Sequence, residues 1–379
     1  MSQQRGARRT SGWVIGRVAG VPVILSPSWL LVAGLILLIY FPFVRRVLGD
    51  AGAVTIALTT LGFVVVLFVS VLLHELAHGL TAARYGFPAR EYVVTFWGGH
   101  TSFDRDLSTP GASAVVSAAG PAANLLLAAA AWAATEADLP APLWIVLWGA
   151  TITNALVAGF NLLPGLPLDG GRVLEALVWK VTGRRHPGTV AAAWGGRAVA
   201  VGLAVWVLGV PLLQGRSPDL TTLIWVALLA SVLWSGATQA LASADVRRAA
   251  EGLDLRPLAR PVLLVPAGTA VAELDARAPE AREPGGPPVV LMRGEVPVAV
   301  VDVEALAAIP PEHRPTTALD AVARTLYREM VVGHVTGPEA VSAVARAQRH
   351  TSEVLLTQDR QVIGMVRVAD VARALGRPA

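Results

Sequence analysis

Long runs of apolar residues alternate with short polar connections over the first 245 residues of the chain. Six of these runs contain no charged side chain, and they cover residues 18–44, 51–73, 107–135, 139–168, 198–215 and 220–244. Each is long enough, at about 1.5 Å per helical residue, to cross a hydrocarbon layer of about 30 Å. The pattern therefore predicts six transmembrane helices. Between the second and third runs, the β-prone segment 92–103 contains Gly98 and Gly99, which predicts a small β-hairpin at the membrane edge.

The pattern changes after residue 245, where charged residues and prolines become frequent. Segments 288–306 and 353–371 align without a gap, and each is typical of a strand, a turn, a second strand and the start of a helix. We expect a membrane domain over residues 1–245, a linker over 246–260 and a cytoplasmic α/β domain over 261–379.

Composition supports a membrane protein, because 54% of the residues are hydrophobic and only 15% are charged. If the amino terminus is cytoplasmic, the same side receives Arg5, Arg8, Arg9, Arg17, Arg84, Arg90, Arg105, Arg172, Lys180, Arg184, Arg185, Arg247 and Arg248. The other side receives only Arg45, Arg46 and Arg216. The positive-inside rule then predicts a multi-pass protein of the cell membrane with both termini in the cytoplasm.

Charge and cysteine content exclude other classes. Membrane topology accounts for the net charge of +4, so no nucleic-acid partner is needed. The chain has no cysteine, which excludes disulfides, cysteine-ligated zinc and thiol catalysis.

The second apolar run contains the motif H-E-x-x-H at His74, Glu75 and His78. On a helix, residues four apart share one face, so both imidazoles can bind one zinc ion while the glutamate acts on a nearby water molecule. Ionisable side chains are costly inside a bilayer, and metal coordination would compensate that cost for the histidines.

A third ligand is predicted from the segment 160–177, in which Asp169 ends the longest uncharged run. Pro164, Pro167, Gly170 and Gly171 surround Asp169 and interrupt the helical pattern. Broken backbone at membrane depth is tolerated where it is buried in protein or lines a watery cavity, which is what a metal site requires.

Together the stretches HELAH, GPAANLL and NLLPGLPLDGG resemble the site-2 protease family of intramembrane zinc metalloproteases. The resemblance implies one Zn²⁺ per chain held by His74, His78 and Asp169, with Glu75 as the catalytic base. It also implies that Asn161 lies near the substrate carbonyl or the catalytic water, and that Asn124 faces the protein interior.

The repeated segments of the last third resemble a tandem pair of cystathionine-beta-synthase (CBS) modules, which occur in one subgroup of that family. The second copy keeps Gly364 and Asp370 of the ribose-contacting pattern, with Arg367 where serine or threonine is usual, and the first copy has Ala299 and Ala305 at the two matching places. Two interpretations follow: an adenine nucleotide binds between the copies, or the module serves for homodimerisation or docking.

The function predicted is that of an endopeptidase acting on a membrane-spanning or membrane-associated protein, regulated through its CBS-like domain. A substrate helix must unwind before hydrolysis, and the hairpin at 92–103 could receive it by edge pairing. The alternatives are a CBS-regulated transporter, which should show repeats among its spans, and a catalytically idle membrane adaptor, which would not need Glu75.

Overall fold

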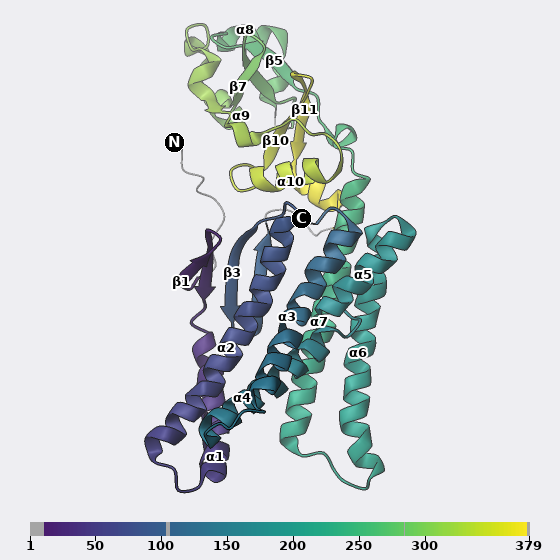
Figure 1. The fold of residues 1–379 in the computed structure, drawn as a ribbon. Coiled ribbons are helices and arrows are strands. Elements are labelled where there is room, and N and C mark those ends of the chain that lie inside the picture. The colour runs from purple at the N-terminus through teal and green to yellow at the C-terminus, as the bar shows by residue number, and fades with distance from the viewer. Residues whose placement is uncertain (1–10, 104–106, 284, 377–379) are drawn as a thin grey trace. The chain divides into compact units, whose positions relative to one another are not determined.

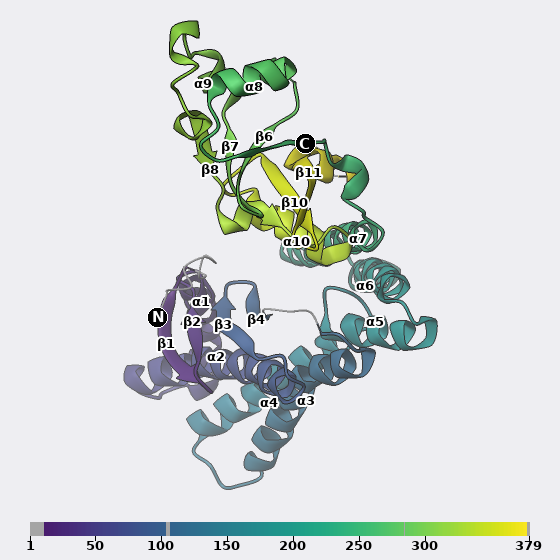
Figure 2. The ribbon, with the colours of Figure 1, turned by 90° about the horizontal axis from the view of Figure 1, so that it is seen from above.

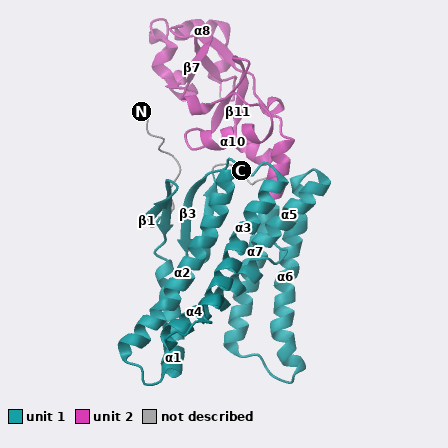
Figure 3. Cartoon of the chain, in the orientation of Figure 1, with its two compact units in different colours: residues 1–242 teal, residues 243–379 magenta. Residues whose placement is uncertain are grey.

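The computed structural model describes residues 11–103, 107–283 and 285–376. The chain divides into two compact units, residues 1–242 and 243–379, which Figure 3 shows in different colours.

Unit 1 is dominated by long apolar helices. Six helices in the described part of the chain are long and apolar enough to cross a membrane, which confirms the predicted number. They are α1 (Trp29–Leu48), α2 (Ala53–Arg84), α3 (Pro110–Ala134), α4 (Ala141–Asn161), α6 (Arg185–Leu213) and α7 (Leu220–Glu251). Figure 1 shows them as long coiled ribbons, with the shorter helix α5 (Asp169–Thr182) between α4 and α6 along the chain.

The first predicted span, 18–44, is wrong at its beginning. Its first residues belong to strands β1 (Trp13–Val18) and β2 (Val21–Leu25), and α1 starts only at Trp29. The physical reason is the pairing of β2 with another strand, because Val23 lies opposite Tyr92 in a parallel ladder. Hydrophobic content alone did not distinguish this buried strand from helix.

The predicted hairpin is half of a larger sheet. Strands β3 (Ala89–Thr95) and β4 (Gly98–Phe103) pair antiparallel, and the sheet has the order β1-β2-β3-β4, visible in Figure 2. Tyr92 anchors the sheet, since its side chain is only 1% exposed and packs with Leu72 and Leu76 of α2. Burial raises the pKa of the Tyr92 phenol, so this side chain stays neutral.

The fourth predicted span, 139–168, also differs from the structure, because α4 ends at Asn161. Residues 162–168 form a loop that contains Pro164 and Pro167, which have no amide hydrogen for a helix. The loop docks on α6, where the Leu166 amide donates to Ala192 O at 2.9 Å and Gly196 allows close contact with Leu166. This docking sets the start of α5 at Asp169.

Unit 2 contains two copies of one arrangement, in agreement with the predicted repeat. The first sheet has the order β5-β6-β7-β8, with β5 (Leu263–Pro266), β6 (Val289–Arg293), β7 (Val296–Val301) and β8 (Ala323–Thr325). The second has the order β11-β10-β9, with β9 (Val331–Val332), β10 (Glu353–Gln358) and β11 (Gln361–Arg367). The helices are α8 (Val271–Arg277), α9 (Val303–Ala307), α10 (Gly337–Ala347) and α11 (Val368–Ala374).

Short 3-10 turns complete this unit at Arg256–Leu258, Pro279–Arg282, Pro311–His313, Leu319–Val322 and Arg328–Met330. In each copy, an antiparallel pair of strands leads into a helix, and a further strand runs parallel to the first strand of the pair. Each copy has its own apolar core, and Val290, Leu355 and Met365 form a smaller cluster shared by both sheets.

The predicted linker 246–260 is not a free connection. Residues 246–251 continue α7, and both Ala250 and Leu255 are buried in the core of the second copy. The segment resembles a linker in the sequence because it is rich in charged residues, although apolar side chains such as Ala250 and Leu255 hold it in place.

Candidate metal centre and active site

The two histidines of the H-E-x-x-H motif lie on one face of α2, as the spacing predicts. His74 and His78 are both buried, and their Nε2 atoms are 3.0 Å apart. His74 precedes the end of α2 at Arg84 by about 15 Å of helix, so the pair lies inside the apolar part of the span rather than at its end.

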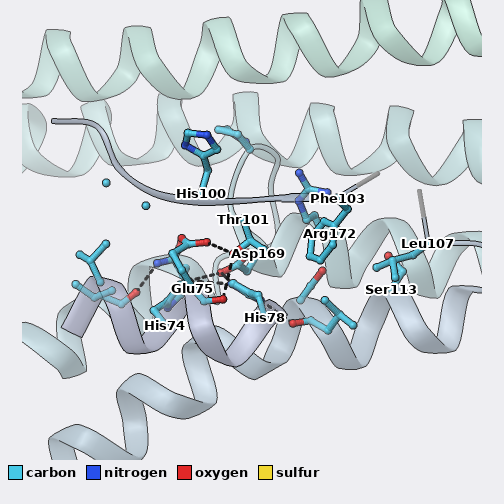
Figure 4. A pocket seen from close by; sticks show the side chains of 18 of the residues that line it. His74, Glu75, His78, His100, Thr101, Phe103, Leu107, Ser113, Asp169 and Arg172 are labelled. Atoms are coloured by element: carbon cyan, nitrogen blue, oxygen red, sulfur yellow. Dashed lines mark hydrogen bonds and ion pairs between the residues drawn. The ribbon is translucent and has the colours of Figure 1, made fainter. Parts of the chain in front are cut away.

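Asp169, the first residue of α5, lies beside these two histidines. Its Oδ2 atom lies 3.0 Å from His74 Nε2 and 3.2 Å from His78 Nε2. Figure 4 shows the three side chains converging, although Asp169 follows His74 by 95 residues. The loop at 162–168 makes this possible, because it ends α4 and starts α5 beside the histidines.

The geometry of these three atoms fits a zinc ion. Zinc ligands lie about 2.0–2.2 Å from the metal, so neighbouring ligand atoms of a tetrahedral site are separated by about 3.3 Å. The observed separations of 3.0 to 3.2 Å are within a few tenths of that value. Two imidazoles and one carboxylate also form a donor set that leaves one position open, as in catalytic zinc sites.

The outer nitrogen of each imidazole has its own partner on α3. His78 Nδ1 donates to Val116 O at 2.7 Å, and His74 Nδ1 lies 2.5 Å from Asn124 Oδ1. Gly120 lies between these contacts, and a Cβ atom there would come within 2.6 Å of His74 Nε2. A glycine at this position therefore keeps the space beside the ligand atoms open.

Glu75 is buried next to the cluster, with 7% of its surface exposed. The Thr101 hydroxyl of β4 contacts its carboxylate oxygen Oε2 at 2.7 Å and its main-chain oxygen at 3.1 Å. One hydroxyl proton is thus shared between two acceptors of the same residue. Strand β4 therefore holds the Glu75 carboxylate in place through Thr101.

Asn161 lies at the end of α4 and lines the same cavity as the cluster. Its side-chain nitrogen donates to Val157 O at 3.0 Å, which engages one of its two N–H groups. Asn161 therefore lies in the wall of the cavity into which the three converging side chains open.

The cavity in front of the cluster measures about 680 Å³. Residues of α2, the β3–β4 turn, β4, α3, α4 and α5 line it, including the exposed His100 and Arg172 that Figure 4 labels. A cavity of this size accommodates several residues of an extended peptide.

Sequence reasoning missed some of these contacts. Thr101 and Val116 carry no local signal, because they reach the site only through sheet pairing and helix packing. Gly120 is the first residue of the GPAANLL stretch, but nothing in the sequence predicts its closeness to both imidazoles.

Comparison with known proteins places this site in context. The family model described as "Peptidase family M50" matches residues 62–140 and 136–205, which include His74, Glu75, His78, Asn161 and Asp169. A Synechocystis protein named as a zinc metalloprotease is 27% identical over 95% of this chain and 94% of its own length. The Mycobacterium tuberculosis protein Rip3, also named as a zinc metalloprotease, is 28% identical over 95% of this chain and 92% of its own.

Two solved structures are also similar to this chain, at lower sequence identity than these relatives. The site-2 protease of Methanocaldococcus jannaschii is 23% identical, covers 60% of this chain and 94% of its own, and has a TM-score of 0.41. The CBS domain of a bacterial CNNM/CorC family Mg²⁺ transporter is 18% identical, covers 39% of this chain and 93% of its own, and has a TM-score of 0.27.

Proposed function

Because the chain belongs to peptidase family M50, the site-2 protease family of membrane zinc metalloproteases, we propose that it hydrolyses a peptide bond in or near a transmembrane segment of another protein. One observation carries the proposal. His74, His78 and Asp169 converge to within 3.2 Å of one another, beside the Glu75 carboxylate, in an apolar helix bundle.

His74, His78 and Asp169 would hold one zinc ion per chain. Zinc in such a site supplies Lewis-acid chemistry, which polarises a peptide carbonyl and makes water nucleophilic near neutral pH. Glu75 accepts a proton from the attacking water and delivers it to the leaving amine nitrogen. Thr101 keeps the Glu75 carboxylate in one orientation through its hydroxyl contact. Among the described residues Asn161 uses one amide hydrogen on Val157 O, and its other amide hydrogen can donate to the substrate carbonyl as negative charge develops there.

The substrate would reach this site as an extended chain. A transmembrane helix hides its peptide bonds in internal hydrogen bonds, so the segment must unwind before attack. Strand β4 is the last strand of its sheet and contacts Glu75 through Thr101, so a chain added to its edge would pass beside the catalytic base. This supports edge pairing as the mode of substrate binding.

The repeat in unit 2 supports a regulatory role as a CBS-like pair that takes an adenine nucleotide or forms a homodimer. Gly364 gives little support for the nucleotide, because its small size is already required where Arg260 O packs against it. Titration of the purified protein with ATP and AMP, followed by calorimetry, distinguishes nucleotide binding from dimerisation alone.

The proteolytic function is tested by metal analysis of the purified protein beside two variants. Glu75→Gln should keep about one zinc per chain and lose cleavage, because the ligands remain while the base is gone. Asp169→Ala should lose both zinc and cleavage. Asp219→Asn is the matched control, since Asp219 is an exposed carboxylate that bonds Thr222 at the start of α7, away from the metal centre.

Zinc retained in full by Asp169→Ala would contradict the proposed ligand set. Zinc bound by the wild type without any cleavage of membrane proteins would instead favour the idle adaptor.

A further inference from the structure

A chain of amide side chains connects His74 on α2 to α4, a helix that carries none of the three converging side chains. Asn124 on α3 contacts His74, and its Nδ2 donates to Asn154 Oδ1 on α4 at 2.7 Å. Asn154 Nδ2 in turn donates to Ala150 O at 2.9 Å. Asn124 is fully buried and Asn154 is 3% exposed, so water does not compete for these groups.

The direction of every bond in this chain follows from its last acceptor. A main-chain carbonyl can only accept, so the side-chain atom of Asn154 next to Ala150 O must be the nitrogen. The Asn154 side-chain oxygen then faces Asn124 and must accept a hydrogen bond from Asn124 Nδ2. The Asn124 oxygen is consequently turned toward His74, where it accepts from Nδ1.

A second carbonyl supports the same direction. Asn124 Nδ2 also lies 3.5 Å from Ser70 O on α2, a weaker contact that again requires a donor at this atom. If Asn124 were flipped, its oxygen would face both Ser70 O and Asn154 Oδ1, and buried acceptors would be left without donors.

We propose that Asn154 is a positioning residue that fixes the tautomer of His74 through Asn124. With hydrogen held on Nδ1, the lone pair of His74 is confined to Nε2, the atom that faces His78 and Asp169. His78 achieves the same result directly through Val116 O. The inference rests on the proposed metalloprotease function, because it takes His74 as a metal ligand.

Two replacements of Asn154 separate loss of the hydrogen-bond acceptor from a change of the side chain alone. Asn154→Leu removes the acceptor for Asn124 with a side chain of similar shape, which frees Asn124 to rotate and His74 to adopt the other tautomer. Asn154→Asp keeps an oxygen for Asn124 Nδ2 and, as the neutral acid, donates its O–H to Ala150 O, so it should preserve the chain. Thr151→Val is the matched control, because Thr151 lies on the same helix and its hydroxyl donates only to Leu147 O of that helix.

Two measurements test the proposal. Zinc affinity is measured by chelator competition, and the imidazole ¹⁵N shifts of histidine-labelled, metal-free protein report the tautomer, with the His74 signal assigned from His74→Gln. We expect Asn154→Leu to weaken zinc binding about tenfold, at the low end of effects for partners of metal-bound histidines. The His74 signal should also lose its Nδ1–H character, while Asn154→Asp and Thr151→Val stay close to wild type.

An unchanged affinity and an unchanged His74 tautomer in Asn154→Leu would overturn the proposal. If that variant does not fold, Asn154→Ala replaces it, because it removes the same acceptor without adding bulk. Failure of the wild type to bind zinc would defeat the proposed function, while the ¹⁵N spectra of the metal-free protein would still decide the role of Asn154.

Discussion

At the residue scale, the parts of the site that depend on helix geometry were predictable. His74 and His78 are four residues apart on one helix, so their convergence follows from 3.6 residues per turn. Asp169 was predicted by a different signal, the proline and glycine residues that interrupt an apolar run. Thr101 and Asn154 gave no such signal, because their roles arise from contacts with residues 26 and 30 positions away.

Thr101 leads to a prediction about Glu75. Thr101→Val keeps the shape of the side chain but removes the hydroxyl that contacts Oε2 at 2.7 Å. We expect zinc content to stay unchanged and kcat to fall about tenfold, because a misoriented base loses part of the roughly 10²–10⁴-fold contribution of proton transfer. Both quantities are measured on purified protein with a cleaved model substrate.

Thr59→Val is the control for this experiment. Thr59 is buried on the same helix as Glu75, but its hydroxyl donates to Thr55 O of that helix. A loss of zinc in Thr101→Val would show that the hydroxyl supports the metal site rather than the base, and an unchanged kcat would show that it supports neither.

At the element scale, errors in the predicted spans have a common cause. A hydropathy pattern identifies apolar segments but not their hydrogen-bond partners. Residues 21–25 are as apolar as a helix, yet they form β2 because a parallel partner strand is available in β3. Residues 162–168 end α4 because Pro164 and Pro167 cannot continue the helix, and α6 supplies the contacts that hold the loop. Both partners are distant in the chain, so the pattern could not reveal them.

The edge of β4 leads to a prediction about the substrate. Edge pairing uses alternate backbone N–H groups of the added strand, because successive residues of a strand point their amides in opposite directions. N-methylation of one alternating set in a cleaved model peptide should raise KM at least tenfold, since several main-chain bonds are lost. N-methylation of the other set serves as the control and should change KM little.

Equal effects of both N-methylated peptides on cleavage would count against strand pairing, because side-chain or helical recognition does not distinguish the two sets. The measurement uses full-length protein in detergent or vesicles, with zinc content checked in parallel.

At the scale of the whole molecule, the sequence predicted the class of fold better than the boundary between the two units. Six long apolar helices and a repeated strand-strand-helix arrangement both follow from periodic patterns within short segments. The boundary between the units did not follow as easily. Ala250 and Leu255 are two apolar residues in a charged stretch, and only packing against the second copy shows that they belong to its core.

The predicted orientation in the membrane can be tested because the chain contains no cysteine. A single introduced cysteine is then the only thiol that a membrane-impermeant reagent can label. Ser352 and Ser217 are both exposed, the first in unit 2 and the second in the connection between α6 and α7. If both termini are cytoplasmic, Ser217→Cys should be labelled in intact cells and Ser352→Cys only after the cells are opened.

The positive-inside rule requires this result, since Arg45, Arg46 and Arg216 are the few basic residues assigned to the outer side. Labelling of Ser352→Cys in intact cells would show that the predicted topology is reversed.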